Sequence, residues 1–211
     1  MSRIDLWTRY GEQFKQGAFQ LLWWGYVDSR SQFGSTTAEE VISDYIVRAI
    51  KERLTDPHTP EDFARFFAEN EKPVSSPTRA GKQRRRIDIY VESSSPRERL
   101  AYFFEAKRLR RPTHSVTGYT GPDGMELFVD GEYAAEEVQG GMIGYIQSDS
   151  AGHWETLLDG AIRLDVRKKL SVREHLTRCV ILPRLNDTWR TAHLRPNGSE
   201  FVLYHMFLDC T

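Results

Sequence analysis

Apolar residues recur at helical spacing in three segments of the first third of the chain. Residues 5–24 place an apolar side chain at nearly every third or fourth position and predict a helix, although Gly11 and Gly17 weaken it. Residues 38–54 follow a Ser/Thr-rich start and predict an amphipathic helix. Residues 59–70 begin with Thr-Pro and two acidic residues, which is typical of a helix N-terminus, and predict a third helix.

The pattern changes from helices to strands in the middle of the chain. Residues 86–107 set two apolar runs on either side of a polar turn and predict a β-hairpin. A loop rich in Pro, Ser, Gly and basic residues precedes this hairpin. The rest of the chain predicts, in order, a mobile Gly-rich stretch at 113–124, a helix running into an apolar segment at 132–147, a helix at 154–170, a short buried strand at 177–183, and a hairpin formed by 189–194 and 200–209.

This order of elements, a helix, then antiparallel strands, then mixed helix and strand, is typical of an α/β or α+β fold. The 211 residues, 39% of them hydrophobic, suffice for one good core. We therefore predict an N-terminal helical and aromatic arm at 1–34 and a single domain at 35–211. The aromatic residues of the arm either pack in the core, which is the preferred interpretation, or form a surface for a protein partner.

Composition narrows the class of protein. Lys and Arg total 29 against 30 Asp and Glu, so the net charge of −1 does not by itself indicate a nucleic-acid partner. The two cysteines are too few for a disulfide framework or a zinc site and are expected to be reduced. The chain has no apolar run of membrane-spanning length and no signal-peptide pattern at its start. The sequence thus predicts a cytoplasmic protein with no membrane partner.

The predicted hairpin carries charges where a buried hairpin should be apolar. If its turn is centred between Pro96 and Arg97, Asp88 lies directly opposite Glu105, with Cβ atoms roughly 4.5–5.5 Å apart. Lys107 shares the strand face of Glu105, because side chains alternate between faces. Two opposed carboxylates repel each other, and one lysine neutralises only part of their charge.

A divalent cation between these carboxylates would explain their placement. With oxygen ligands and no Cys or His nearby, the expected ion is Mg²⁺ or Mn²⁺ rather than zinc. The alternative is a solvated sheet end that holds a structural Asp–Lys or Glu–Lys pair. The apolar flanks of both strands argue against a solvated sheet end.

Asp88 followed by Glu105-Ala106-Lys107 resembles the D...(D/E)-x-K core of the PD-(D/E)XK, or restriction-endonuclease-like, nuclease superfamily. The resemblance covers about residues 36–147, and the proline of the signature is missing. It implies a restriction-endonuclease-like core with a mixed central sheet flanked by helices. It also implies a metal-dependent endonuclease, with the metal held by Asp88, Glu105 and the carbonyl group of Ala106. Lys107 would orient or help deprotonate the attacking water, which leaves 5′-phosphate and 3′-hydroxyl products.

Many members of this superfamily add a glutamate from the preceding helix. Glu39 and Glu40 both qualify here. At 100° per residue, Glu39 falls at the edge of the apolar face while Glu40 points away, so Glu39 is the predicted fourth catalytic residue. The alternative is that both glutamates only complement the helix N-terminus.

Two basic runs flank the predicted site in sequence and predict a phosphate track. The residues expected to bind substrate are Arg84, Arg85, Arg86, Arg108, Arg110 and Arg111. DNA is the favoured substrate and RNA the alternative, in a bacterial restriction, repair or phage-defence setting. The competing hypothesis is a catalytically silent nuclease-fold subunit that binds nucleic acid within a larger defence assembly, with an ATPase or another defence subunit docked on the N-terminal arm. A homodimer is a further expected arrangement.

Overall fold

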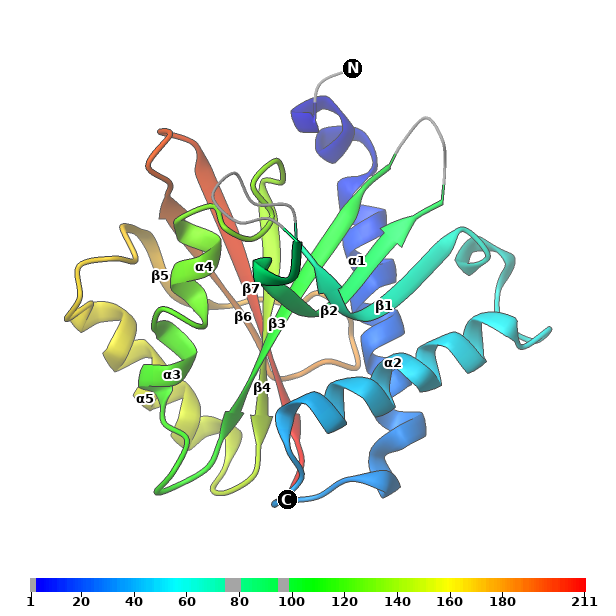
Figure 1. Ribbon diagram of the computed structural model, residues 1–211, viewed down its shortest axis with the longest axis horizontal. Coiled ribbons are helices and arrows are strands. Elements are labelled where there is room, and N and C mark those ends of the chain that lie inside the picture. Colours follow the sequence, from blue (N-terminus) through cyan, green and yellow to red (C-terminus); the bar gives the residue numbers. More distant parts are fainter. Residues whose placement is uncertain (1–2, 75–80, 95–98) are drawn as a thin grey trace.

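The computed structural model describes residues 3–74, 81–94 and 99–211 (Figure 1). Its centre is a seven-stranded mixed sheet with the strand order β1-β2-β3-β4-β7-β6-β5. β1 to β3 form an antiparallel meander, β4 lies parallel to both β3 and β7, and β6 and β5 continue antiparallel. The strands are β1 Phe66–Pro73, β2 Arg86–Ser93, β3 Ala101–Leu109, β4 Gln139–Ile146, β5 Val172–Arg178, β6 Thr188–Leu194 and β7 Glu200–Asp209.

Helices cover both faces of this sheet, so the chain is an α+β protein with a mixed sheet flanked by helices (Figure 1). α1 and α2 pack into one core cluster with β3, and α3 to α5 contribute to a second cluster on the other face. The helices are α1 Arg3–Ser29, α2 Glu39–Thr55, α3 Val116–Thr120, α4 Met125–Val129 and α5 Ala151–Leu164, with short 3₁₀ helices η1 Arg30–Gln32, η2 Glu61–Phe63 and η3 Gly81–Gln83. Among the described residues, no helix has the length and apolar character to cross a membrane.

The N-terminal segment forms one 27-residue helix, longer than its pattern predicted. Phe19 and Leu22 of α1 are fully buried in the cluster that also holds strand residues. This part of the arm therefore packs in the core, which was the preferred of the two interpretations of its aromatic residues. The helix approaches α2 closely at Gly25, where an added Cβ would lie 2.6 Å from the carbonyl oxygen of Ile46. A glycine is required at this crossing because the obstacle is backbone. The predicted domain boundary after residue 34 stays a prediction.

Several predicted elements are confirmed. The helix expected at 38–54 is α2, the hairpin at 86–107 is β2 and β3, and the terminal hairpin is β6 and β7. The helix expected at 154–170 is α5, which ends early, at Leu164, because Asp165 adopts a left-handed conformation with φ of 31°.

Four predicted elements are wrong. The third helix at 59–70 is instead η2 followed by β1, because Phe66 and Ala68 alternate into the core of an edge strand paired with β2. The helix expected to start at 132 is irregular chain that leads into β4 at Gln139. The Gly-rich stretch contains α3, whose Tyr119 is fully buried. The strand at 177–183 ends at Arg178, where β5 stops.

Candidate functional site

The β2–β3 hairpin has the register that the sequence predicted. Ile89 pairs with Phe104 and Tyr90 with Phe103, so one further step along the same register sets Asp88 opposite Glu105. Phe104 and Ala106 lie in the core cluster beneath α1 and α2, whereas Phe103 packs against the cluster of the other face. By strand alternation Glu105 therefore lies on the face of Phe103, and Asp88 on the face of Tyr90.

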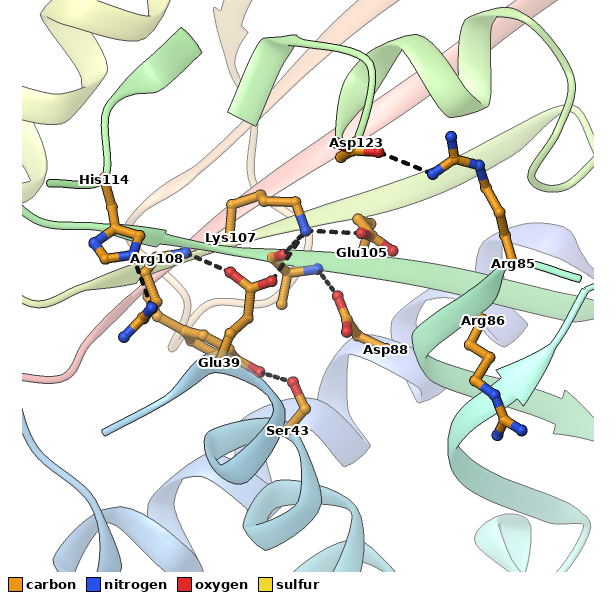
Figure 2. A network of polar contacts seen from close by, with 12 residues as sticks. Glu39, Ser43, Arg85, Arg86, Asp88, Glu105, Lys107, Arg108, His114 and Asp123 are labelled. Atoms are coloured by element: carbon orange, nitrogen blue, oxygen red, sulfur yellow. Dashed lines mark hydrogen bonds and ion pairs between the residues drawn. The ribbon is translucent and has the colours of Figure 1, made fainter. Parts of the chain in front are cut away.

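Lys107 is the centre of a polar cluster at this end of the hairpin (Figure 2). Its Nζ atom donates to Glu105 Oε1 at 2.8 Å, to Ala106 O at 2.7 Å and to Glu39 Oε1 at 3.0 Å. The second oxygen of Glu39 accepts a hydrogen bond from the backbone N–H of Arg108 at 2.8 Å. These contacts tie the start of α2 to the charged end of β3.

Asp88 joins this cluster through the backbone. Its Oδ2 atom accepts a hydrogen bond from the N–H of Ala106 at 2.7 Å. The Asp88 side chain thereby reaches across to β3 between Glu105 and Lys107, as Figure 2 shows. The four residues predicted as catalytic, Glu39, Asp88, Glu105 and Lys107, thus lie together at one place in the fold.

Burial makes the carboxylates of this cluster costly to ionise. Burial raises the pKa of Asp88 to about 7, against the attraction of Lys107 and the hydrogen bond from Ala106. Burial and the neighbouring Asp88 raise the pKa of Glu105 well above its usual range. Burial alone would lower the pKa of Lys107, but Glu105, Glu39 and Asp88 outweigh it and raise that pKa, so the ammonium stays charged. Perturbed carboxylates around a fixed cation are typical of a functional site.

One oxygen of Glu105 lacks a donor in the part of the chain that the structure describes. Glu105 Oε2 is buried and has no hydrogen-bond partner among the described residues. A buried carboxylate oxygen in this state carries a desolvation cost that a cation or a donor would remove. The hydroxyl group of Tyr133 lies close enough to Glu105 for the two to interact, but its single proton is donated to Arg86 O at 2.8 Å.

Tyr133 is a member of the cluster that sequence analysis missed. The residue is 3% exposed, and burial together with the nearby Glu105 and Asp88 carboxylates raises the pKa of its hydroxyl group. It lies in the irregular chain before β4, which the sequence pattern predicted to be helical. Because no local spacing marks an isolated tyrosine in a loop, its position could only come from the folded chain.

The choice between the two helix glutamates agrees with the predicted helical phase. Glu39 is the first residue of α2 and turns to Lys107, whereas Glu40 is exposed. On α2 itself, Val47 is buried while Val41 is 40% exposed.

Several arginines of the predicted phosphate track already have partners within the fold. Arg85 pairs with Asp123 at 2.9 Å, and Arg111 forms a two-bond pair with Asp149. Figure 2 shows Arg86 pointing away from the carboxylates, where its Nη1 atom donates to Glu71 O.

The other members of the track differ in their contacts. Arg108 contacts the His114 ring nitrogen Nε2 at 2.7 Å, and Arg110 is half-buried. Arg84 and Lys82 are exposed and form no ion pair with another described residue. Arg79, which belongs to the same basic run, lies outside the described residues.

The predicted metal donors are present, but the ammonium of Lys107 contacts two of them, Glu105 Oε1 and Ala106 O. Across the described ranges, no group of three or more His, Cys, Asp or Glu side chains is arranged to hold a metal ion. Comparisons of the chain with family models, with curated proteins and with solved structures each gave no match.

Proposed function

We propose that this protein is a metal-dependent nuclease that hydrolyses phosphodiester bonds, with DNA as the favoured substrate. The observation that carries the proposal is the cluster of Asp88, Glu105 and Lys107 on adjacent strands, with an oxygen of Glu105 that is buried and has no hydrogen-bond partner within the described ranges. A protein that used these residues only for stability would gain little from burying two opposed carboxylates beside a single lysine.

The topology around the cluster also supports the resemblance to PD-(D/E)XK nucleases. A helix that supplies Glu39 precedes a three-stranded meander, Asp88 lies on its middle strand, and Glu105 with Lys107 lies on the next. β4 then returns parallel to β3. This is the order of helix, Asp strand and E-x-K strand that the resemblance implies.

The donor set suits a hard divalent cation such as Mg²⁺ or Mn²⁺. Asp88, Glu105 and the carbonyl group of Ala106 offer only oxygen atoms, and Glu105 Oε2 is buried without a hydrogen-bond partner among the described residues. When bound there, the cation would polarise the scissile phosphate and lower the pKa of a water molecule.

The side chains of the cluster would position the substrate and balance charge. The Lys107 ammonium lies between Glu105 and Glu39 and can offset negative charge that develops on the phosphate. Glu39 holds that ammonium in place while its second oxygen fixes the backbone at Arg108. The hydroxyl group of Tyr133 can turn from Arg86 O toward Glu105 and supply the missing donor.

A second function is favoured by one specific observation. The Lys107 ammonium already has three acceptors, which is the arrangement of a closed structural ion cluster. Under this alternative the chain is a catalytically silent nucleic-acid-binding subunit, and an ATPase or another defence subunit supplies the activity of the assembly.

Cleavage of plasmid, single-stranded DNA and RNA with Mg²⁺, Mn²⁺ or EDTA separates the two functions. The nuclease proposal expects cleavage with either cation, none with EDTA, and a loss of about 10²-fold or more in Asp88→Asn and Lys107→Ala. Glu40→Gln removes a carboxylate charge from the exposed side of α2 and should cleave like the wild type. Rates must be expressed per folded molecule, because Lys107 also contacts buried Glu105. Nucleic-acid binding without cleavage under every condition would favour the silent subunit.

A further inference from the structure

A pocket of about 440 Å³ opens beside the carboxylate cluster, on the same face of the hairpin. Tyr90 and Phe103, a directly opposed pair, line it, and they lie two residues along their strands from Asp88 and Glu105. Two residues of strand correspond to roughly 7 Å, and both pairs face the same way. The pocket is therefore continuous with the face on which a phosphate would meet Glu105.

The lining combines aromatic surface with charged edges. The Tyr90 and Phe103 rings meet edge to face, with centroids 5.1 Å apart. Lys72 lies 3.6 Å from the centroid of the Tyr90 ring, and Arg84 is an exposed cation at the rim. Glu136 adds an exposed carboxylate that can accept hydrogen bonds. Such a lining suits a flat aromatic ligand that carries both donors and acceptors at its edge and a negative charge attached to it.

The far wall of the pocket is fixed by a buried arginine. Arg195 is 4% exposed, and its guanidinium donates to the carbonyl groups of Tyr133, Ala134, Ala135 and Glu137 at 3.0–3.3 Å. The same segment brings Tyr133 to the carboxylate cluster and Ala134 to Glu137 to the pocket. Because one arginine holds both parts, the wall is preformed in relation to the cluster.

We propose that this pocket binds an unpaired nucleobase adjacent to the scissile phosphate of the strand being cut. The inference rests on the proposed function for the position of the phosphate. A base inside a duplex is stacked and paired and cannot enter a side pocket, so the enzyme would act on single strands or on strands with an extruded base. Arg84 at the rim would bind a flanking phosphate, whereas Lys72 already pairs with Glu69 at 3.1 Å.

The test compares the binding of single-stranded oligonucleotides that carry one abasic nucleotide at successive positions. Affinity is measured by fluorescence anisotropy in EDTA at a fixed salt concentration, so that no strand is cut. Ala135→Trp fills the pocket from an exposed position. Ala64→Trp introduces the same side chain at an exposed residue outside the pocket lining and is the matched control.

For the wild type and Ala64→Trp, an abasic nucleotide at one position should weaken binding about 5- to 100-fold, as expected for a lost base–aromatic stack. In Ala135→Trp this loss should shrink to about 2-fold or less, because the Trp side chain already excludes the base from the pocket and removing that base then costs little affinity. Phe103→Leu keeps apolar volume without the ring and should show the same reduction, with circular dichroism confirming the fold. An equal abasic loss in all four proteins, or no sensitive position in the wild type, would overturn the pocket.

Cleavage measured on the same oligonucleotides with Mg²⁺ keeps this outcome separate from that of the proposed function. Cleavage with no base-sensitive position refutes the pocket and leaves the nuclease. A base-sensitive position without cleavage by either cation refutes the nuclease and leaves a pocket that serves nucleic-acid binding alone.

Discussion

Replacing Asp88 by Asn should stabilise the folded protein while it removes the proposed metal site. Asp88 is 8% exposed and lies opposite Glu105, so the fold buries two carboxyl groups beside one lysine. Asn keeps nearly the same shape, and its amide oxygen can still accept the hydrogen bond from the N–H of Ala106. The substitution therefore removes charge while it keeps the contact.

The size of the gain follows from the cost of ionising Asp88. Its pKa rises from 3.8 to about 7 on folding. Each pKa unit corresponds to about 1.4 kcal/mol, so at pH 8 the ionised side chain costs the fold on the order of 4 kcal/mol. Asn loses part of this gain, because a hydrogen bond to a neutral acceptor is weaker than one to a carboxylate. The expected net increase in the free energy of unfolding is about 1–3 kcal/mol.

Urea denaturation at pH 8 in EDTA measures this difference directly, with Glu40→Gln as the control for losing a carboxylate at an exposed position. Glu40→Gln should change the free energy of unfolding by less than about 0.5 kcal/mol. Added Mg²⁺ should raise the midpoint of the wild type and leave Asp88→Asn unchanged, because only a protein that binds the ion gains from it. A destabilised Asp88→Asn in EDTA would show that the Asp88 charge stabilises the fold and would refute the argument from the cost of burying that charge.

Three further outcomes are expected. Lys107→Met should destabilise the protein by about 3–5 kcal/mol in urea denaturation, because buried Glu105 loses its cation; a change below 1 kcal/mol would contradict this. Gly25→Ala should lower the melting temperature, because its Cβ would meet Ile46 O at 2.6 Å, whereas Gly160→Ala in the open face of α5 should raise it slightly; equal effects would refute the close helix crossing. The two buried histidines should lower stability as the pH drops from 6.5 to about 4, because burial lowers the pKa of His193 to about 4 and of His205 to about 3, so the unfolded chain takes up these protons first; protonation of Asp88 and Glu105 acts in the opposite direction. The stability of His205→Asn relative to the wild type should therefore increase as the pH drops, while that of exposed His58→Asn should stay constant, and a constant difference for His205→Asn would contradict this.

The sequence predicted the opposed placement of Asp88 and Glu105 because a hairpin is a local structure with a simple geometry. Once the turn is centred between residues 96 and 97, strand alternation and register determine which side chains oppose each other. The observed pairing of Ile89 with Phe104 has this register. The position of Glu39 followed from helical phase in the same way, because 3.6 residues per turn determines which of two neighbouring side chains turns toward the sheet.

Local pattern failed where distant contacts decide the structure. Residues 59–70 have a good helix N-terminus, yet the second half of the segment forms an edge strand. It does so because it pairs with β2 and because Phe66 is buried in the core. Tyr119 was expected in a mobile loop, but its hydroxyl group contacts the buried His205 ring at 3.0 Å, a partner 86 residues away. Neither contact can be read from the composition of the segment itself.

The segment before β4 also takes its conformation from a distant contact, and it contributes to the proposed function. The sequence pattern predicted a helix here, but the segment is irregular, and four of its carbonyl groups accept hydrogen bonds from Arg195, about 60 residues later in the chain. Buried carbonyl groups need partners, so this arginine specifies a conformation that the segment could not hold alone. That conformation places Tyr133 beside Glu105 and forms the wall of the proposed base pocket. Substrate selection would therefore depend on a residue that lies in neither the carboxylate cluster nor the pocket lining, and that the sequence motif gives no reason to examine.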